Sequence, residues 1–369
     1  MPEETPPKLV DLLTLTLRRE ASDLHLKEGQ PPLLRINSEI VPTPMAVLTA
    51  REIETLVTEV MTERCRHDLE TVGSAEFSYM LDAGDRFRVT AFRQRGVVSV
   101  AARRVVRSVR TFADLHLPVA TLERICKVRQ GLVIFCGTAG SGKSTSIAAC
   151  LNHINQTRRC HICTLEDPIE FIFEDELSFV DQREIGTDVA SFEVALKVLM
   201  REDPDVVLVG ELRDRQAVTA ALRAAETTRL VFTTIHAASA PGAITRLLDL
   251  FPQDERAITR QSIATNIVAI IGQKILPGAD PVAVPLVPAT EVMLATGTIR
   301  KMIRDGEEAH IAGLLAADTD LGMHDFTQDL ARLIREEWVD PKVAYEVAPN
   351  PEALKMAVRG IDVMKGTLR

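Results

Sequence analysis

The spacing of apolar residues predicts a mixed structure for roughly the first hundred residues. A short amphipathic helix is expected at residues 9–20, because leucines recur there at helical spacing. Alternating stretches at 22–26, 33–36 and 87–92 are typical of strands, and residues 50–69 have a helical pattern. Short strands mixed with helices predict a small α+β domain.

The pattern changes beyond residues 106–112, where the apolar periodicity lapses. Short apolar runs then alternate with helical stretches, which predicts a largely parallel sheet covered on both faces. Strands are predicted at 131–136, 161–165, 206–209 and 230–234, and helices at 147–154, 191–201 and 217–225, the last capped by Asp214. We therefore expect an N-terminal domain at 1–108 and an α/β domain at 109–369.

The C-terminal part is predicted to be helical again after Pro252. Two long amphipathic helices are expected, at residues 299–315 and 324–337. Four prolines predict a turn-rich connection before them, at positions 277, 281, 285 and 288.

Composition and charge narrow the class of protein. The chain has 369 residues, of which 46% are hydrophobic and 26% charged, and this suits two globular domains. Its net charge of -9 argues against binding to nucleic acid, because neutralising phosphates requires an excess of Lys and Arg. Aromatic residues make up only 4%, too few for stacking platforms, so no nucleic-acid partner is expected.

The expected location is cytoplasmic. Residues 1–8 are acidic and proline-rich, unlike a signal peptide. The sequence contains no run of about 18 apolar residues, so no insertion into a membrane is expected. The six cysteines are scattered, which suits a reducing compartment. Cys160 and Cys163 form a CxxC pair without the second ligand pair that a zinc site needs.

A glycine-rich stretch follows the predicted strand at 131–136 and begins the next predicted helix. It consists of Gly137, Thr138, Ala139, Gly140, Ser141, Gly142, Lys143 and Ser144, followed by Thr145, and fits the pattern GxxxxGK[ST]. The glycines let backbone N–H groups converge on phosphate oxygens, and the helix N-terminus adds partial positive charge. Lys143 is expected to reach the terminal phosphates, and the Ser144 hydroxyl to complete a Mg²⁺ shell. The stretch predicts binding of ATP with Mg²⁺.

Hydrolysis needs further polar groups at the same edge of the sheet, where the strands end. Glu166 and Glu211 each come just after an apolar run, so one can orient water and the other can hold the metal. His236 follows the run at 230–235 and could donate a hydrogen bond to the γ-phosphate. For Asp167, Glu170 and Asp214, an alternative role as helix caps or surface charges stays open.

These motifs resemble those of secretion ATPases of the PilT, PilB and GspE type. Residues 166–171 are similar to the Asp box of that family, 201–214 to its Walker B segment and 234–236 to its His box; the likeness extends to 21–26, 87–89 with Arg103, 299–304 and 321–326. Residues 299–304 resemble the C-terminal helix signature of the PilT-like retraction ATPases of type IV pili, and residues 321–326 resemble the closing segment of the family.

The resemblance implies a smaller PAS-like α+β domain followed by a RecA-like P-loop ATPase domain. It implies a homo-hexameric ring, with nucleotide between the two domains and with Arg88 and Arg103 presented from a neighbouring subunit. In this family Glu166 would be the general base, Glu211 would hold the metal and His236 would sense the γ-phosphate. The departure from the family pattern at Thr138-Ala139 should be tolerated, because these positions of the loop contribute mainly backbone. The departures at Thr228-Arg229 and Ala237-Ala238 lie at the His box and concern the sensing step and turnover more than nucleotide binding.

The function implied is that of a motor for pilus retraction and twitching motility. Its expected partners are an inner-membrane platform protein, through which it would be peripheral to that membrane, and a paralogous pilus ATPase. Alternatives are an assembly or secretion ATPase, or an auxiliary nucleotide-binding subunit that regulates a partner motor. A motor acting on nucleic acid is disfavoured by the acidic balance.

Overall fold

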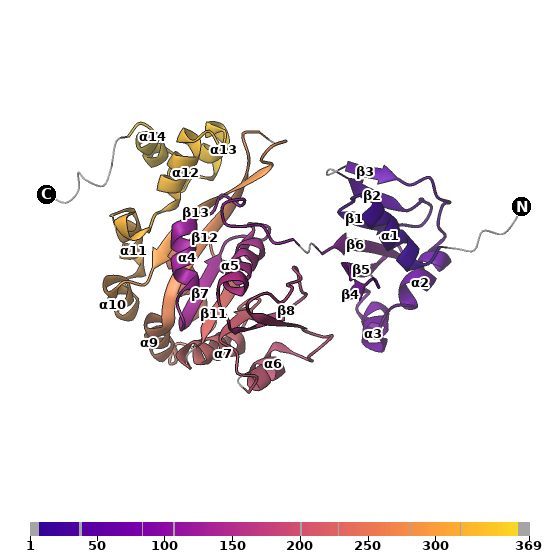
Figure 1. Ribbon diagram of the computed structural model, residues 1–369, viewed down its shortest axis with the longest axis horizontal. Helices are drawn as coiled ribbons and strands as arrows, with labels where there is room; N and C mark the ends of the chain where they lie inside the picture. The colour runs from indigo at the N-terminus through magenta and orange to yellow at the C-terminus, as the bar shows by residue number, and fades with distance from the viewer. Residues whose placement is uncertain are drawn as a thin grey trace, which may run out of the picture. The chain divides into compact units, whose positions relative to one another are not determined.

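The computed structural model describes residues 7–36, 39–82, 84–105, 108–199, 201–227, 229–280, 282–317 and 319–360. The chain forms two compact units (Figure 1). The first comprises Met1–Ser108 with Glu170–Ile172, and the second comprises Val109–Ile169 and Phe173–Arg369. Several expectations concern positions outside the described residues: the N-terminal residues 1–6, the start of the expected boundary at 106–107, Thr228 and Pro281.

The first unit is an antiparallel sheet packed against helices. Over its described residues the sheet has six strands in the order β3-β2-β1-β6-β5-β4. The elements are α1 (Leu9–Arg18), β1 (Asp23–Leu26), β2 (Leu33–Ile36), β3 (Glu39–Pro42), α2 (Ala50–Thr58), α3 (Glu63–Thr71), β4 (Ser74–Met80), β5 (Arg86–Gln94) and β6 (Val97–Arg104). Leucines on one face of α1 and alternate residues of β5 are buried in a common core, as their spacing predicts.

The helical pattern predicted at 50–69 is confirmed, and this segment forms two helices. α2 ends at Thr58, and α3 begins at Glu63. The hydroxyl of Thr62 accepts a hydrogen bond from the Cys65 N–H at 3.3 Å, which caps the new helix.

The second unit is built on a larger sheet, seven strands wide over its described residues, in the order β13-β12-β7-β11-β10-β8-β9. All neighbours pair in parallel except β12 and β13. The strands are β7 (Gly131–Cys136), β8 (His161–Glu166), β9 (Phe179–Glu184), β10 (Val206–Val209), β11 (Leu230–Ile235), β12 (Ile267–Pro277) and β13 (Leu286–Leu294).

Helices precede the first of these strands, connect several of them and follow the last. They are α4 (Val119–Cys126), α5 (Lys143–Thr157), α6 (Phe192–Leu199), α7 (Arg215–Glu226), α8 (Ala240–Asp249), α9 (Arg256–Asn266), α10 (Gly297–Asp305), α11 (Glu308–Ala317), α12 (Phe326–Arg335), α13 (Pro341–Val347) and α14 (Pro351–Val358).

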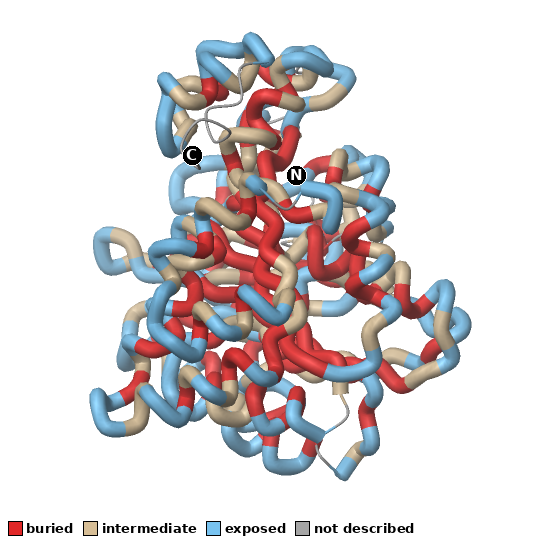
Figure 2. Tube along the Cα trace, turned by 90° about the vertical axis from the view of Figure 1, so that its left-hand side faces the viewer, coloured by how far each residue is buried: buried red, intermediate tan, exposed pale blue. Residues whose placement is uncertain are grey.

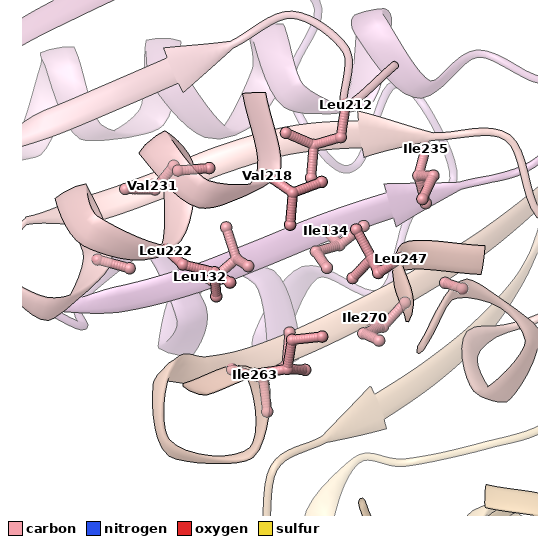
Figure 3. Close-up of a cluster of buried hydrophobic side chains, with 14 of the residues drawn as sticks. Leu132, Ile134, Leu212, Val218, Leu222, Val231, Ile235, Leu247, Ile263 and Ile270 are labelled. Atoms are coloured by element: carbon pink, nitrogen blue, oxygen red, sulfur yellow. The ribbon is translucent and has the colours of Figure 1, made fainter. Parts of the chain in front are cut away.

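Both faces of this sheet are buried, which explains why the central strands β7 and β10 contain only apolar residues. Along β7, Leu132 and Ile134 belong to one core cluster, and Val133 and Phe135 belong to another. Figure 3 shows the first cluster, in which side chains from α7, α8 and α9 gather over the strands. Along the tube in Figure 2, buried stretches gather in the interior, and exposed stretches lie at the outer loops. The predicted parallel sheet with two covered faces is therefore confirmed.

The segment after Pro252 was predicted to be helical with a turn-rich connection, and this was wrong for β12 and β13. These strands form an antiparallel hairpin that widens the sheet beside β7. Pro277 ends β12, and Pro288 lies inside β13, which pairs only with β12 among the described strands. The helix predicted at 299–315 is also two helices, because Gly306 ends α10 with a left-handed φ of +79°.

One carboxyl group of the hairpin is buried in this core. Burial raises the pKa of Glu291 on β13 to about 7, because the carboxylate loses its hydration. A hydrogen bond from the Ala240 N–H and the nearby charge of Lys274 oppose this rise, whereas Asp325 adds to it. The charged form of Glu291 is thus less favourable in the native state than in the unfolded chain.

Replacing Glu291 by glutamine should change how stability depends on pH. The native state keeps the Glu291 proton after the unfolded chain has lost it, so the free energy of unfolding of the wild type should fall as the pH rises from about 4.5 to about 7. Glu291→Gln should gain up to about 3 kcal/mol relative to the wild type across that range. Urea unfolding at pH 4 and pH 8 measures it, with the exposed Glu346→Gln as control. A difference between wild type and Glu291→Gln that does not change with pH would contradict the expectation.

Candidate nucleotide-binding site

The candidate site residues of the second unit lie at one edge of its sheet. β7, β11, β10 and β8 are consecutive neighbours and run parallel, so their carboxyl ends meet at the same edge. The glycine-rich loop leaves β7 there, Glu166 ends β8, and Glu211 and His236 follow β10 and β11. The topology therefore brings together the segments that the sequence singles out.

The glycine-rich loop adopts backbone conformations that favour glycine. Gly142 has a φ of +83°, and Gly137 has a φ of +157°. A Cβ atom at Gly137 would lie 2.4 Å from the Gln273 carbonyl oxygen, and one at Gly142 would lie 2.8 Å from Gln273 Nε2. Gly137 is thus required by space, because the backbone of β12 lies against it, whereas a side chain at Gly142 would meet the amide end of Gln273.

Polar groups of the loop are arranged around its backbone. Lys143 Nζ donates hydrogen bonds to the carbonyl oxygens of Gly137 at 3.0 Å and Thr138 at 2.8 Å. Ser141 Oγ is buried and lacks a hydrogen-bond partner among the described residues. Ser144 and Thr145 lie in the first turn of α5, whose N-terminus begins at Lys143. A buried hydroxyl, an ammonium group and a helix N-terminus form a cradle that suits phosphate oxygens.

Gln273 is a residue of this site that the sequence analysis missed. It is buried on β12, and its Oε1 accepts a hydrogen bond from Ser146 Oγ of α5 at 2.9 Å. Gln273 therefore supports the loop from behind, through Gly137 and Gly142 on one side and α5 on the other. The segment was not predicted to be a strand, so no local signal in the sequence indicated this residue.

Glu211 and His236 are in direct contact. His236 Nε2 lies 3.2 Å from Glu211 Oε1, and Arg213 Nε donates a hydrogen bond to Glu211 Oε2 at 2.7 Å. Arg213 Nη1 also lies 3.6 Å from Asp167 Oδ2, so it connects the segments after β10 and β8. The hydrogen bond to Glu211 raises the pKa of Arg213. Arg213 was not among the predicted site residues, although its place two residues after Glu211 in the segment that follows β10 was a signal.

Glu166 is buried at the end of β8 and is held by its neighbours. Its Oε1 accepts hydrogen bonds from Thr164 Oγ1 at 2.7 Å and from Gln182 Nε2 at 3.3 Å. A carboxylate fixed in this way keeps one orientation at the strand end. Of the acids with an open alternative role, Asp214 caps α7 by accepting from the Ala217 N–H at 2.8 Å.

Arg88 and Arg103 belong to the first unit, where they lie opposite each other on β5 and β6. Arg103 Nε donates to Asp23 Oδ1 at 2.7 Å, and Arg88 is paired with Glu76. Burial alone would raise the pKa of Asp23, but hydrogen bonds from Arg103 and Ser22 outweigh it and hold that pKa below its usual range. The two arginines thus form one cluster with two acids.

The cysteines, metal ligands and membrane-spanning helices can also be examined over the described residues. Over these residues, no group of three or more His, Cys, Asp and Glu side chains could hold a metal ion. Cys163 is buried, and burial raises its pKa to about 12. No helix within the described part of the chain is both long and apolar enough to cross a membrane.

The sequence matches a known family over more than half of its length. The family described as type II/IV secretion system protein matches residues 95–319. The type IV pilus retractation ATPase PilT of Pseudomonas aeruginosa is 35% identical, over 93% of this chain and 99% of its own. The type IV pilus ATPase PilU of the same organism is 34% identical, over 94% of this chain and 90% of its own. The chain therefore belongs to the type II/IV secretion ATPase family, and within it is PilT-like.

Solved structures agree with this assignment. The crystal structure of the pilus retraction motor PilT with bound ADP matches with a TM-score of 0.85 and 36% identity, covering 95% of this chain and 99% of that one. The ATPase DotB of Legionella pneumophila shares the fold, with a TM-score of 0.74 at 23% identity over 94% of this chain and 98% of its own. The predicted fold class, an α/β ATPase domain preceded by a smaller α+β domain, is confirmed.

Substituting two glycines of the loop should separate backbone strain from steric conflict. Gly140→Ala and Gly142→Ala both place a side chain at positive φ, but only position 142 has a neighbour within 4 Å of the added Cβ. Gly142→Ala should therefore weaken ADP binding by about tenfold more than Gly140→Ala does, which corresponds to roughly 1.4 kcal/mol. Calorimetric titration with ADP measures both affinities. Equal losses would show that contact with Gln273 does not matter.

Proposed function

We propose that this protein is an ATP-hydrolysing motor that powers retraction of a type IV pilus, and thus twitching motility, through interdomain movements in a homo-hexameric ring. The observation that carries the proposal is the shared strand edge, where the glycine-rich loop, Glu166 and the Glu211–His236 pair lie together. Similarity to PilT over almost the whole of both chains supports the same activity.

Nucleotide binding falls to the glycine-rich loop. Backbone N–H groups of residues 137–145 and the N-terminus of α5 would hold the phosphates, and Lys143 would exchange its two carbonyl contacts for phosphate oxygens. The buried Ser141 hydroxyl, which lacks a partner among the described residues, fits such a ligand. ADP bound to the similar PilT structure supports nucleotide as the ligand.

The donor set also fits Mg²⁺, a hard cation that takes oxygen ligands. Ser144 and Glu211 would hold the ion, which when bound neutralises charge on the terminal phosphates. Glu211 accepts from Arg213 and lies beside His236, so these two residues fix the direction of its carboxylate.

Glu166 would act as the general base that orients and deprotonates the attacking water. Its anchoring by Thr164 and Gln182 supports this role, because a base must be held within hydrogen-bond reach of one position. His236 would donate a hydrogen bond to the γ-phosphate and lose it after hydrolysis, which gives the two nucleotide states different contacts.

The coupling to movement would involve Arg88 and Arg103, presented to the nucleotide of a neighbouring subunit. The N-terminal PAS-like domain, 1–108, and the RecA-like domain, 109–369, would change their angle as these contacts form and break. The ring would work in the cytoplasm, peripheral to the inner membrane through a pilus platform protein. A paralogous pilus ATPase is a second partner in this proposal. The proposal includes neither insertion of this protein into the membrane nor binding to nucleic acid.

An auxiliary, regulatory pilus ATPase is the second candidate function. The observation in its favour is the departure at Ala237-Ala238, directly after the proposed sensor His236. A subunit with this turn could bind ATP and hydrolyse it slowly while it regulates a partner motor.

ATP hydrolysis by the purified protein decides between these functions. We expect Mg²⁺-dependent turnover that Lys143→Ala and Glu211→Gln each reduce by at least about 100-fold, because each removes charge or metal binding at the transferred phosphoryl group. Tight ATP binding without turnover in the wild type would reject the autonomous motor and favour the auxiliary subunit.

Arg88→Ala and Arg103→Ala should reduce turnover without weakening ADP binding to the isolated subunit. Each arginine would act only on a neighbour's nucleotide, so mixing either variant with Lys143→Ala protein should restore some activity in mixed rings. The matched control is Arg93→Ala, at an arginine of the same strand β5. Failure of complementation would show that the arginines do not act between subunits.

A further inference from the structure

The turn that carries His236 is attached to the core by a buried carboxylate on a distant strand. Residues 236–239 connect β11 to α8. The first N–H of that helix, from Ala240, donates a hydrogen bond of 2.5 Å to Glu291 Oε1 on β13, and both residues are buried. The partners are 51 residues apart in the chain. The contact therefore fixes where the turn after His236 ends.

Other contacts at this end of α8 leave the N–H of Ala240 to Glu291. Ser239 caps the helix by accepting from the Gly242 N–H at 3.2 Å, and Pro241 has no N–H to donate. A carboxylate at a helix N-terminus is also favoured by the partial positive charge there. Glu291, which is not part of α8, thus accepts the hydrogen bond from the N–H group at which the turn ends and the helix begins.

The space for Glu291 depends on Gly272 of β12. Gly272 lies opposite Glu291 of β13 and opposite Cys136, the residue before the glycine-rich loop. A Cβ atom at Gly272 would lie 3.3 Å from Glu291 Cβ and 3.1 Å from Phe326 Cζ. Gly272 is not among the glycines with positive φ, so glycine here provides room rather than a special backbone conformation.

Helix α8 is itself held against the same strands. Leu247 of α8 lies beside Ile134 of β7 and Ile270 of β12 in the buried cluster (Figure 3). With the body of α8 fixed by packing and its first N–H fixed by Glu291, the turn from His236 to Ser239 is anchored at its far end. Its near end is fixed by β11, which ends at Ile235.

We propose that Glu291 is a positioning residue for ATP hydrolysis, which acts by holding the His236 turn through the Ala240 N–H. The inference rests on the proposed role of His236 as the γ-phosphate sensor. Loss of the hydrogen bond would let the turn move away from Glu211 and lower the rate of the chemical step. ADP affinity would change little, because the glycine-rich loop keeps its own contacts.

The test compares three changes at the two ends of this hydrogen bond. Glu291→Gln keeps an oxygen acceptor, Glu291→Leu removes it, and Ala240→Pro removes the donor at a helix position that tolerates proline. We expect Glu291→Leu and Ala240→Pro to lower kcat for ATP about tenfold with ADP affinity within about twofold, and Glu291→Gln to stay near the wild type. Ala240→Pro leaves the buried carboxylate in place, so it keeps the test valid if Glu291→Leu does not fold.

Combination with His236→Ala shows whether the effect passes through His236. In that background, Glu291→Leu and Ala240→Pro should lower kcat no further, since residues that act as one unit are not additive. An equal further loss, or no loss in the wild-type background, would overturn the inference.

A second readout separates this inference from the proposed function. Amide hydrogen exchange of peptides covering residues 236–243, measured with ADP present, should quicken about tenfold in Glu291→Leu and not in Glu291→Gln. If the wild type shows no ATP turnover, the proposed motor fails, and this exchange measurement alone decides whether Glu291 holds the turn. Unchanged exchange in Glu291→Leu would reject the positioning role.

Discussion

Parallel pairing of four buried strands is the constraint on which the site depends. β8, β10, β11 and β7 are hydrogen-bonded side by side, so the residues that follow each strand meet at one edge. Helices on both faces supply the apolar contacts that hold these strands together. A shift of one strand by one residue would exchange its two buried faces and displace its terminal residue, so packing and chemistry are specified by the same register.

The sequence predicted those parts of the fold that depend on local pattern. The four strands, the glycine-rich loop and the cap at Asp214 all have their signal within a few residues. The β12–β13 hairpin was missed because prolines suggested turns, whereas pairing with the sheet decides its structure. Gln273 and Glu291 were missed because each makes its contact with a residue far away in the chain. Their partners Ser146 and Ala240 lie 127 and 51 residues away, and no local pattern reports such contacts.

Hydrogen bonds and ion pairs to two carboxylates organise the site beside the glycine-rich loop. Glu166 is held by Thr164 and Gln182, and Glu211 is held by Arg213 and lies beside His236. A fixed carboxylate needs little reorganisation when charge develops during reaction, which is the main electrostatic advantage of an enzyme site over water. The β12–β13 hairpin supports the same site through Gln273, which accepts a hydrogen bond from Ser146, and Glu291, which accepts one from Ala240. Its role therefore extends beyond widening the sheet.

The acidic partners of Arg88 and Arg103 affect how readily these two arginines could bind a phosphate. Arg103 is paired with Asp23, which is buried, and Arg88 is paired with Glu76. In the proposed ring, a phosphate that recruited Arg103 would compete with the Asp23 carboxylate, and Asp23 would then have one neutralising contact fewer. A more highly charged phosphate chain competes better than a less charged one. The first unit would therefore respond to how much negative charge the phosphates of the neighbouring subunit carry, and not only to whether a nucleotide is bound there.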